Sequence, residues 1–406
     1  MQSVRDWTRR HRRGVAVALG AAALAYVAAQ AAQAKVREWQ ERRGAERTAR
    51  ENLRRRWEQN QQDAGMTVAA LLPALATSVM EELPVERITS ELRRARLGSE
   101  ASRESLTSEA TATTNGAATT TTTGGNAAQA GEGKTKAQLW MELKVSSFAR
   151  TISLVYALSL LVLLTRIQLN LLGRTAYVNS VRDAAAPPDP AIGLEDVRAG
   201  MFGKAREEYQ LSKEYLSFSW WLLNMGWRAL VDVVQRRVEA LLGPQDLRAV
   251  LTAEDLDRLL QEIRDHLEYP GVWQLYLLPD PNDQNMVMRE VATEEEGPKE
   301  VSPTLQRLLD ESRDLIDSPN FDVVLGKMVG AGMDVLRQKL AESTFANGPV
   351  KLASITAGMS REAHLIANAA PNAYLAAVED VQELQAFAAI VYSNFEGGGP
   401  SLNGHV

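Results

Sequence analysis

The chain has 406 residues, of which 45% are hydrophobic and 24% are charged, so it can bury a substantial core and is not a disordered protein overall. It contains no cysteine, which excludes disulfides, thiolate catalysis and cysteine-ligated zinc. Residues 1–60 hold fourteen Lys and Arg against six Asp and Glu, whereas the whole chain has a net charge of −6, so the acidic remainder argues against nucleic-acid binding.

A run of small and apolar residues, 14–34, is the first predicted element. At about 1.5 Å of rise per residue, a helix of this length reaches the roughly 30 Å of a hydrocarbon core, and a single transmembrane anchor is the leading interpretation. The small residues of Ala32-Gln33-Ala34 also suit a cleaved secretory signal, and a buried soluble helix is the third alternative. Basic residues on both sides leave the orientation open by the charge rule. The preceding segment, 1–13, is basic, with Arg9, Arg10, Arg12 and Arg13, and the family resemblance given below implies that it targets the chain to the membrane.

Residues 35–62 are polar and favour helix, which indicates a solvated stem leaving the bilayer. An ordinary charged surface helix of the main domain fits this stretch equally well. A large helical domain is predicted over residues 63–396. Within it, the Ser, Thr, Ala and Gly composition of residues 98–133 predicts a disordered insertion, and 279–303 is expected to be an acidic loop. The tail, 397–406, is predicted to be disordered.

A second apolar stretch, Thr151 to Thr165, lies between Arg150 and Arg166. Its length of about 15 residues falls short of the roughly 20 that a membrane span requires. We therefore expect a central helix buried in a bundle rather than a second membrane crossing. The helical pattern around it extends from Ala137 to Leu172.

Further helices are indicated by apolar periodicity and by capping signals, such as Thr252 before one of them. Strand signals are almost absent. The predicted fold is all-α, with a single N-terminal transmembrane helix followed by a large cytosolic bundle of long helices. The additional helices are expected over Leu194 to Leu242, Ala253 to Glu268, Thr304 to Ile316, Phe321 to Leu340 and Asn372 to Phe395.

Catalytic motifs are missing from the sequence. Of the four histidines, His266 and His364 lie in the predicted domain, and neither has a metal-ligand spacing. Gly133-Lys134-Thr135 resembles the end of a phosphate-binding loop, but Ala128 stands where an earlier glycine is needed. We expect no enzymatic activity, no cofactor or metal, no small-molecule substrate and no nucleic acid. A large anchored helical domain of this kind is expected to bind protein partners, commonly an amphipathic helix in an apolar groove.

Five segments of the sequence together point to a known family: Arg9 to Arg13, Val36 to Arg42, Leu139 to Asn170, Leu305 to Phe321 and Phe387 to Phe395. In this order along one chain, they make it resemble the fungal peroxin-3 family of peroxisomal membrane proteins. The resemblance covers about residues 5 to 396 outside the insertion. It implies a docking receptor whose N-terminal segment targets and anchors it and whose cytosolic helical domain receives peroxin-19, the soluble carrier of new peroxisomal membrane proteins.

The resemblance also implies a groove, near the membrane-distal end, that receives an N-terminal helix of peroxin-19. The groove tryptophan of the family corresponds to Trp140, with Lys136 one turn before it and Leu143 one turn after it. These three positions share one helix face, which gives the correspondence a physical basis. Neighbouring groove positions of the family correspond to Leu92, Gly173 and Ala176.

Peroxisomal membrane localisation follows from the same resemblance, with most of the chain facing the cytosol and peroxisomal membrane lipid around the anchor. A route through the endoplasmic reticulum stays open. An alternative function is a membrane tether that recruits peroxisome inheritance or pexophagy factors through other surfaces. Cargo membrane proteins would reach the chain through peroxin-19.

Overall fold

The computed structural model describes residues 51–96, 134–185, 194–268, 271–292, 297 and 300–394. The chain divides into two compact units, Met1–Gln59 and Asn60–Val406. In the first unit the described residues are 51–59, which are helical. The predicted targeting segment with its four arginines, the anchor, the stem up to residue 50, the insertion 98–133 and the tail all lie outside the described residues.

The second unit consists almost entirely of helices, which confirms the predicted all-α fold. The described sheet is a single antiparallel pair of two-residue strands, β1 (Val250–Leu251) and β2 (Val350–Lys351). The unit opens with helical residues 60–82 and 85–96. The other helices are α4 (Lys136–Ala185), α5 (Leu194–Leu216), α6 (Ser219–Trp221), the π-helix η1 (Leu222–Gly226), α7 (Trp227–Leu242), α8 (Ala253–Asp265), α9 (Trp273–Leu277), α10 (Gln284–Val291), α11 (Pro303–Ile316), α12 (Pro319–Ser343), α13 (Leu352–Asn368), α14 (Ala373–Glu379) and α15 (Gln382–Ser393).

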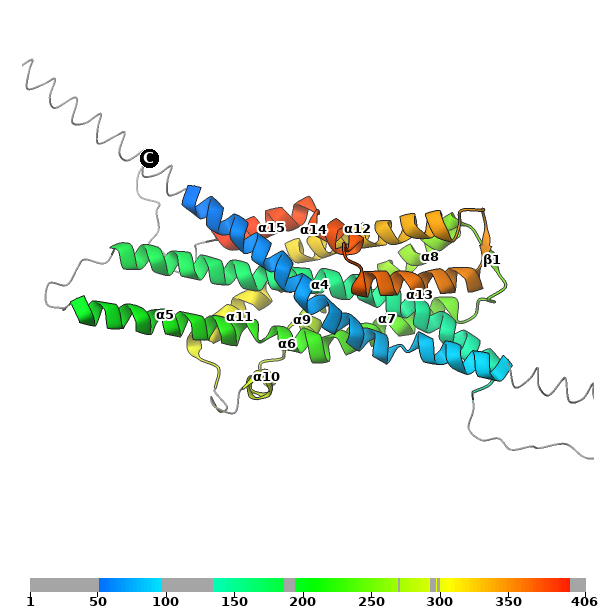
Figure 1. Cartoon of the computed structure of the whole chain (residues 1–406), viewed down its shortest axis with the longest axis horizontal. Coiled ribbons are helices and arrows are strands. Elements are labelled where there is room, and N and C mark those ends of the chain that lie inside the picture. The colour runs from blue at the N-terminus through cyan, green and yellow to red at the C-terminus, as the bar shows by residue number, and fades with distance from the viewer. Residues whose placement is uncertain are drawn as a thin grey trace, which may run out of the picture. The chain divides into compact units, whose positions relative to one another are not determined.

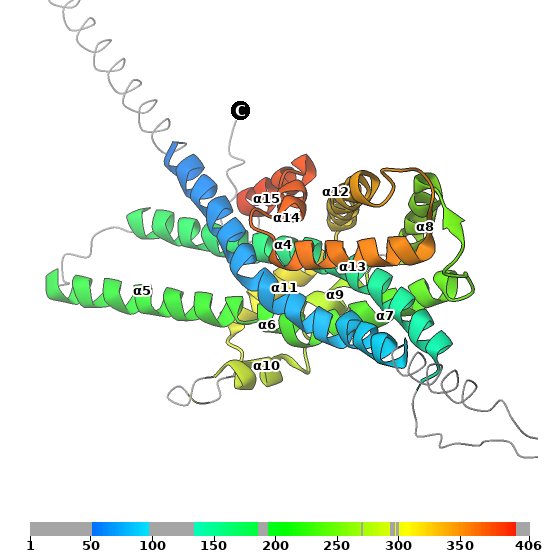
Figure 2. The same cartoon turned by 45° about the vertical axis from the view of Figure 1, so that its right-hand side comes forward.

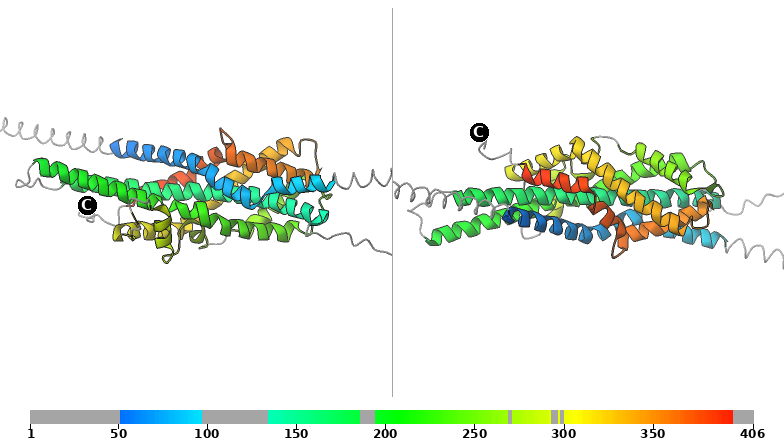
Figure 3. Two further views of the ribbon diagram at one scale, coloured as in Figure 1. Left: turned by 60° about the horizontal axis from the view of Figure 1, so that its bottom comes forward. Right: turned by 90° about the horizontal axis from the view of Figure 1, so that it is seen from above.

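Helix α4 is the centre of this unit. It has 50 residues and is therefore about 75 Å long. Figures 1 and 2 show α5, α6 and α7 on one side of α4 and the helices from α12 to α15 on the other, and α4 contacts members of both groups. Figure 3 shows that α4 runs along the length of the unit. Every residue from Lys144 to Gln168 is buried, as expected of a helix that is apolar on all sides.

The predicted central helix Thr151 to Thr165 is confirmed as part of this core. By length and composition alone, the helical stretches Glu51–Arg96 and Lys136–Asp183 are each sufficient to cross a membrane. In the second stretch, however, 94% of the most apolar window is buried inside the structure. Its apolar surface is therefore already covered by neighbouring helices.

Side-chain caps explain where several helices begin. Thr252 caps α8 as predicted, because its hydroxyl accepts from the Asp255 N–H while the Asp255 carboxylate accepts from the Thr252 N–H. The hydroxyls of Ser302 and Ser318 cap α11 and α12 by accepting from the N–H groups of Leu305 and Phe321, and each serine is followed by a proline in the first helical turn.

The expectation of one helix from Leu194 to Leu242 is wrong. Helix α5 ends at Leu216, and a π-helical turn precedes α7. The break after α5 is a turn at Ser217 and Phe218, and the π-helical turn ends in a close crossing at Gly226, where an added Cβ would lie 1.8 Å from the Tyr276 carbonyl oxygen. A regular helix with any other residue cannot pass α9 at this distance.

Two further predictions need correction. Residues 284–291, inside the expected acidic loop 279–303, form α10 because Val287 and Met288 give the segment an apolar stripe that becomes buried. The expected helix from Asn372 to Phe395 is divided into α14 and α15 by a break at Asp380 and Val381. Helix α13 was not predicted, although its buried side chains recur with helical spacing.

Candidate partner-binding site

A small apolar cluster lies apart from the main core, where residues 85–96 pack on the first turns of α4. Its buried members are Ile88, Leu92 and Leu139, and Leu143 packs against them half-buried. Both elements border the segment 97–133 in the sequence, so this end of the unit is formed by the two chain segments that flank the predicted insertion. The structure thus brings two of the predicted groove residues, Leu92 and Leu143, into one cluster.

Two large apolar side chains next to this cluster are partly open to solvent. Trp140 is 38% exposed and Met141 is 43% exposed. Trp140 lies one turn from Leu143 and one turn from the exposed Lys136, so the three side chains share the face of α4 that borders the cluster. A half-exposed tryptophan beside a buried apolar floor is typical of a protein-binding hot spot.

The helix over residues 85–96 is fixed to α4 by a buried charge. The Arg150 side chain is fully buried, and its Nη1 donates to both carboxylate oxygens of Glu86 at 2.9 Å, while its Nη2 donates to Ser360 Oγ at 2.8 Å. His364 Nε2 lies 2.9 Å from Glu86 Oε1. Burial raises the pKa of Glu86, but hydrogen bonds from the backbone and from Arg150 outweigh it, so the pKa lies below its ordinary value.

These contacts also give the direction of the helix over residues 85–96. Glu86 contacts Arg150, whereas Leu92, later in the chain, clusters with Leu139, earlier in α4. The two helices therefore run antiparallel. Trp140 lies on α4 beside the apolar cluster that the two helices share. This surface is the candidate for the groove that the family resemblance implies, with residues 85–96 as its wall and the first turns of α4 as its floor.

The structure does not bring Gly173 and Ala176 to this groove. Both lie on α4, but 33 residues of helix separate Trp140 from Gly173, a distance of roughly 50 Å. A Cβ at Gly173 would lie 2.8 Å from Tyr392 Cε2, so glycine at this position allows α15 to approach α4. Including these two residues in the groove is therefore wrong, and Gly173 has a packing role instead.

The opposite face of the first turns of α4 borders a cleft that sequence reasoning missed. Its volume is about 270 Å³, and it lies between α4 and α7. Lys144, which is buried, joins the two helices by donating to the carbonyl oxygens of Gly243 at 3.3 Å and Gln245 at 2.6 Å. The cleft is lined by Lys134, Gln138, Met141, Glu142, Val145, Ser146, Gln235 and Glu239.

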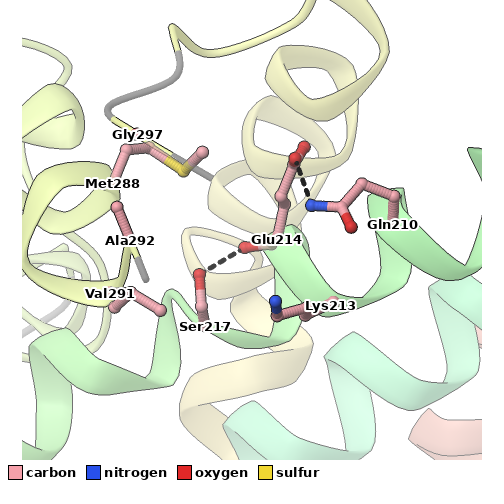
Figure 4. Close-up of a pocket in the computed structure, with 8 residues that line it drawn as sticks. All are labelled: Gln210, Lys213, Glu214, Ser217, Met288, Val291, Ala292 and Gly297. Carbon is pink, nitrogen blue, oxygen red and sulfur yellow. Dashed lines mark hydrogen bonds between the residues drawn. The ribbon is translucent and has the colours of Figure 1, made fainter. Parts of the chain in front are cut away.

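A second cavity, between α5 and the end of α10, is too small for a substrate. Its volume is about 30 Å³, which is room for one or two waters. Figure 4 shows that Glu214 takes part in two hydrogen bonds there, with its side chain accepting from Gln210 and its carbonyl oxygen accepting from Ser217. Neither His266 nor His364 lines either cavity, and no cluster of three or more potential metal ligands occurs among the described residues.

A polar network fixes the start of the second unit on the far half of α4. Asn60 and Gln61 donate to Asn170 Oδ1 at 2.9 and 2.8 Å. Arg166, which is buried, donates to Gln61 and lies 3.7 Å from the carboxylate of Glu379. Burial raises the pKa of Glu379 despite this cation. The N-terminal helix of the unit is thus held in a defined register on α4 and α14.

Comparison with known proteins gives one consistent family. The family model described as peroxin-3 matches residues 6–394. Peroxisomal biogenesis factor 3 of Yarrowia lipolytica is 38% identical over 432 residues, which cover 96% of this chain and 99% of the relative. Peroxisomal membrane protein PEX3 of Komagataella phaffii is 25% identical, with 96% and 98% covered. Peroxisomal biogenesis factor 3 of Homo sapiens is 25% identical, with 97% and 98% covered.

Proposed function

The chain belongs to the peroxin-3 family, and we propose that it is the docking receptor that receives peroxin-19 loaded with newly made membrane proteins. Family membership gives it a role in peroxisome biogenesis and membrane protein import, at the peroxisomal membrane. The proposed role is non-enzymatic, in keeping with relatives that are named as biogenesis factors.

The observation that carries the proposal is the exposure of Trp140 beside a separate apolar cluster. A buried tryptophan would be an ordinary core residue, but Trp140 remains 38% exposed and shares its helix face with Leu143. An incoming amphipathic helix can bury the remaining indole surface against this floor. Aromatic anchors of this kind supply most of the binding free energy at many interfaces.

The proposed topology has residues 14–34 as a single uncleaved anchor and the second compact unit in the cytosol. Three features support this arrangement: the basic segment before the apolar run, the Arg-rich residues after it, and the absence of cysteine from the chain. In the second unit, the long apolar α4 is covered by its own neighbours, so nothing in its burial requires a second crossing.

The test is binding of the peroxin-19 N-terminal helix to residues 35–406, measured by titration calorimetry. Trp140→Ala should weaken binding by more than about 1 kcal/mol. Met141→Ala is the matched control, because Met141 is adjacent and equally exposed but lines the cleft toward α7. Helical content, followed by circular dichroism, should not change in either variant. Equal affinities for the wild type and Trp140→Ala would contradict the assignment of this site.

The cleft between α4 and α7 favours the second candidate function, a tether for inheritance or pexophagy factors. It lies on the other face of the same helix turns and could bind a different partner while the Trp140 groove is filled. A competition assay separates the two surfaces. A tether partner that binds this cleft should remain bound when the peroxin-19 helix saturates the chain, and displacement would contradict a separate surface.

A further inference from the structure

The cleft between α4 and α7 combines an apolar lining with carboxylates and other hydrogen-bond acceptors. From this combination we infer that the cleft binds a lysine or arginine side chain of a partner protein. The stem of that side chain packs on Met141 and Val145, and its charged head lies between Glu142 and Glu239. The inference goes beyond peroxin-19 docking. It rests on the second candidate function for the existence of a partner, and it adds the chemistry by which the cleft selects that partner.

The cleft is separate from the Trp140 groove. The lining residues on α4 recur three or four positions apart and therefore share one helix face. Glu142, a member of this face, follows Trp140 by two residues and thus lies about 200° around the helix from it. Gln235 and Glu239, one turn apart on α7, form the facing wall. A side chain bound in the cleft would therefore leave the Trp140 face open to its own partner.

Two polar side chains in the cleft have unused hydrogen-bonding capacity. Ser146 is only 4% exposed and lines the cleft, yet its hydroxyl has no hydrogen-bond partner among the residues that the structure describes. The half-buried amide of Gln235 also has none within the described ranges. An unsatisfied buried polar group destabilises the folded state, so its presence in a cleft points to a ligand that supplies the missing partner. A ligand with N–H donors would satisfy the oxygens of both side chains.

The charges that line the cleft favour a cation, because two of the three charged side chains are acidic. Glu142 Oε2 accepts from Lys134 Nζ at 2.5 Å, so one carboxylate of the cleft already holds an ammonium group of the chain itself. The Lys134 side chain is 56% exposed, and such an exposed pair is weak enough for a competing cation to replace it. Glu239 has no ion-pair partner in the described part of the chain. The buried Lys144 beside the cleft donates to backbone carbonyls instead.

The size of the cleft suits one long side chain. Its volume of about 270 Å³ lies below the roughly 300–1,000 Å³ that is usual for small-molecule sites. Lysine and arginine combine an apolar stem with a charged head that only donates hydrogen bonds, which matches both the apolar and the acceptor parts of the lining. An acidic side chain would be repelled by the two carboxylates, and an aliphatic one would leave Ser146 unsatisfied.

The test uses the full chain in detergent micelles, isotopically labelled at its methionine methyl groups for NMR. Met141 lines the cleft and reports on its occupancy, and its signal is identified by its loss in Met141→Leu. The probes are the N-acetyl amides of lysine, arginine, norleucine and glutamate. The lysine and arginine amides should shift the Met141 signal saturably in the millimolar range. The norleucine amide, which has the stem without the charge, and the glutamate amide should not.

Variants locate the bound cation. Glu142→Gln and Glu239→Gln should each weaken binding of the lysine amide by about 3- to 10-fold, and Lys134→Gln, which removes the competing ammonium group, should strengthen it by about 2- to 5-fold. Glu254→Gln makes the same charge change at an exposed position on α8 outside the cleft, and should change the affinity by less than about 2-fold. Equal effects of Glu239→Gln and Glu254→Gln, weaker binding in Lys134→Gln, or equal binding of the norleucine amide would overturn the inference.

The outcome for the second candidate function is read separately. If the lysine amide does not shift the Met141 signal, but a tether partner binds beside the peroxin-19 helix, the inference fails and the candidate function remains. If the lysine amide binds and leaves the tether partner in place, the chemistry of the cleft is supported and its use by that partner fails. If the lysine amide binds and displaces the tether partner, both are supported.

Discussion

Replacement of Glu86 by Gln tests whether the buried Arg150 holds the groove wall on α4. The substitution keeps the shape of the side chain but leaves a fully buried guanidinium with only neutral partners. Loss of one partner from a fully buried pair costs about 3–5 kcal/mol. Because the Glu86 side chain is 55% exposed, water screens part of this interaction, and we expect about 1.5–3 kcal/mol, the range for hydrogen bonds to charged groups.

The assay is urea unfolding of the wild type and Glu86→Gln at neutral pH, with Glu91→Gln as the matched control. Glu91 lies on the same helix but meets Arg87 at 3.8 Å on the surface, so its loss should cost less than about 0.5 kcal/mol. A difference between the two variants smaller than about 0.3 kcal/mol would refute the reasoning. The apolar floor would then be enough to position the wall.

The pH dependence of folding stability tests the same ion pair independently, because its direction follows from the lowered pKa of Glu86. The folded pKa of Glu86 is lowered, so the carboxylate contributes stability that is fully present above the ordinary carboxyl pKa of about 4.3 and is lost as the pH falls through the lowered folded value. The stability difference between the wild type and Glu86→Gln should therefore be constant at neutral pH and shrink below about pH 4. A difference that grows on acidification would contradict the pairing.

Substitutions at three glycines give further predictions. Gly226→Ala should cost about 3 kcal/mol or more, since the new methyl group would overlap the Tyr276 carbonyl oxygen at 1.8 Å, whereas Gly203→Ala, with no atom within 4 Å, should be neutral or stabilising in the same urea assay. Gly173→Ala should cost about 1–3 kcal/mol through the contact with Tyr392 and leave the affinity for the peroxin-19 helix unchanged. Weaker binding at unchanged stability would return Gly173 to the groove.

The parts of the fold that could be predicted are those in which local pattern and final environment agree. The apolar Thr151 to Thr165 stretch is too short to span a bilayer and too apolar to be exposed, so burial in a bundle followed directly. The close crossing at Gly226 could not be predicted, because the group that it meets is a carbonyl of α9, 50 residues further along the chain. Local sequence carries no signal for that crossing.

Arg150 and Arg166 show why the site was only partly predictable. In the sequence they look like charged boundaries of an apolar run, but both are buried in the core. Their acidic partners are Glu86 and Glu379, which are distant in sequence. The groove residues on one face of α4 were predicted from the family resemblance, and helical spacing accounts only for the face that they share. Gly173 could have been excluded beforehand, because a continuous helix of 33 residues separates it from Trp140 by roughly 50 Å.

Helix α4 also separates Trp140 from the residues where the N-terminal chain joins the second unit. Asn60 and Gln61, where the N-terminal chain joins the second unit, bind Asn170, and 30 residues of α4 separate Asn170 from Trp140. The groove therefore lies about 45 Å along α4 from the point where the chain leads back toward the apolar run. Between these two positions, the buried Arg150 and Arg166 of α4 pair with Glu86 and Glu379. In the proposed function, a helix that binds at Trp140 would therefore not contact the polar network around Asn170.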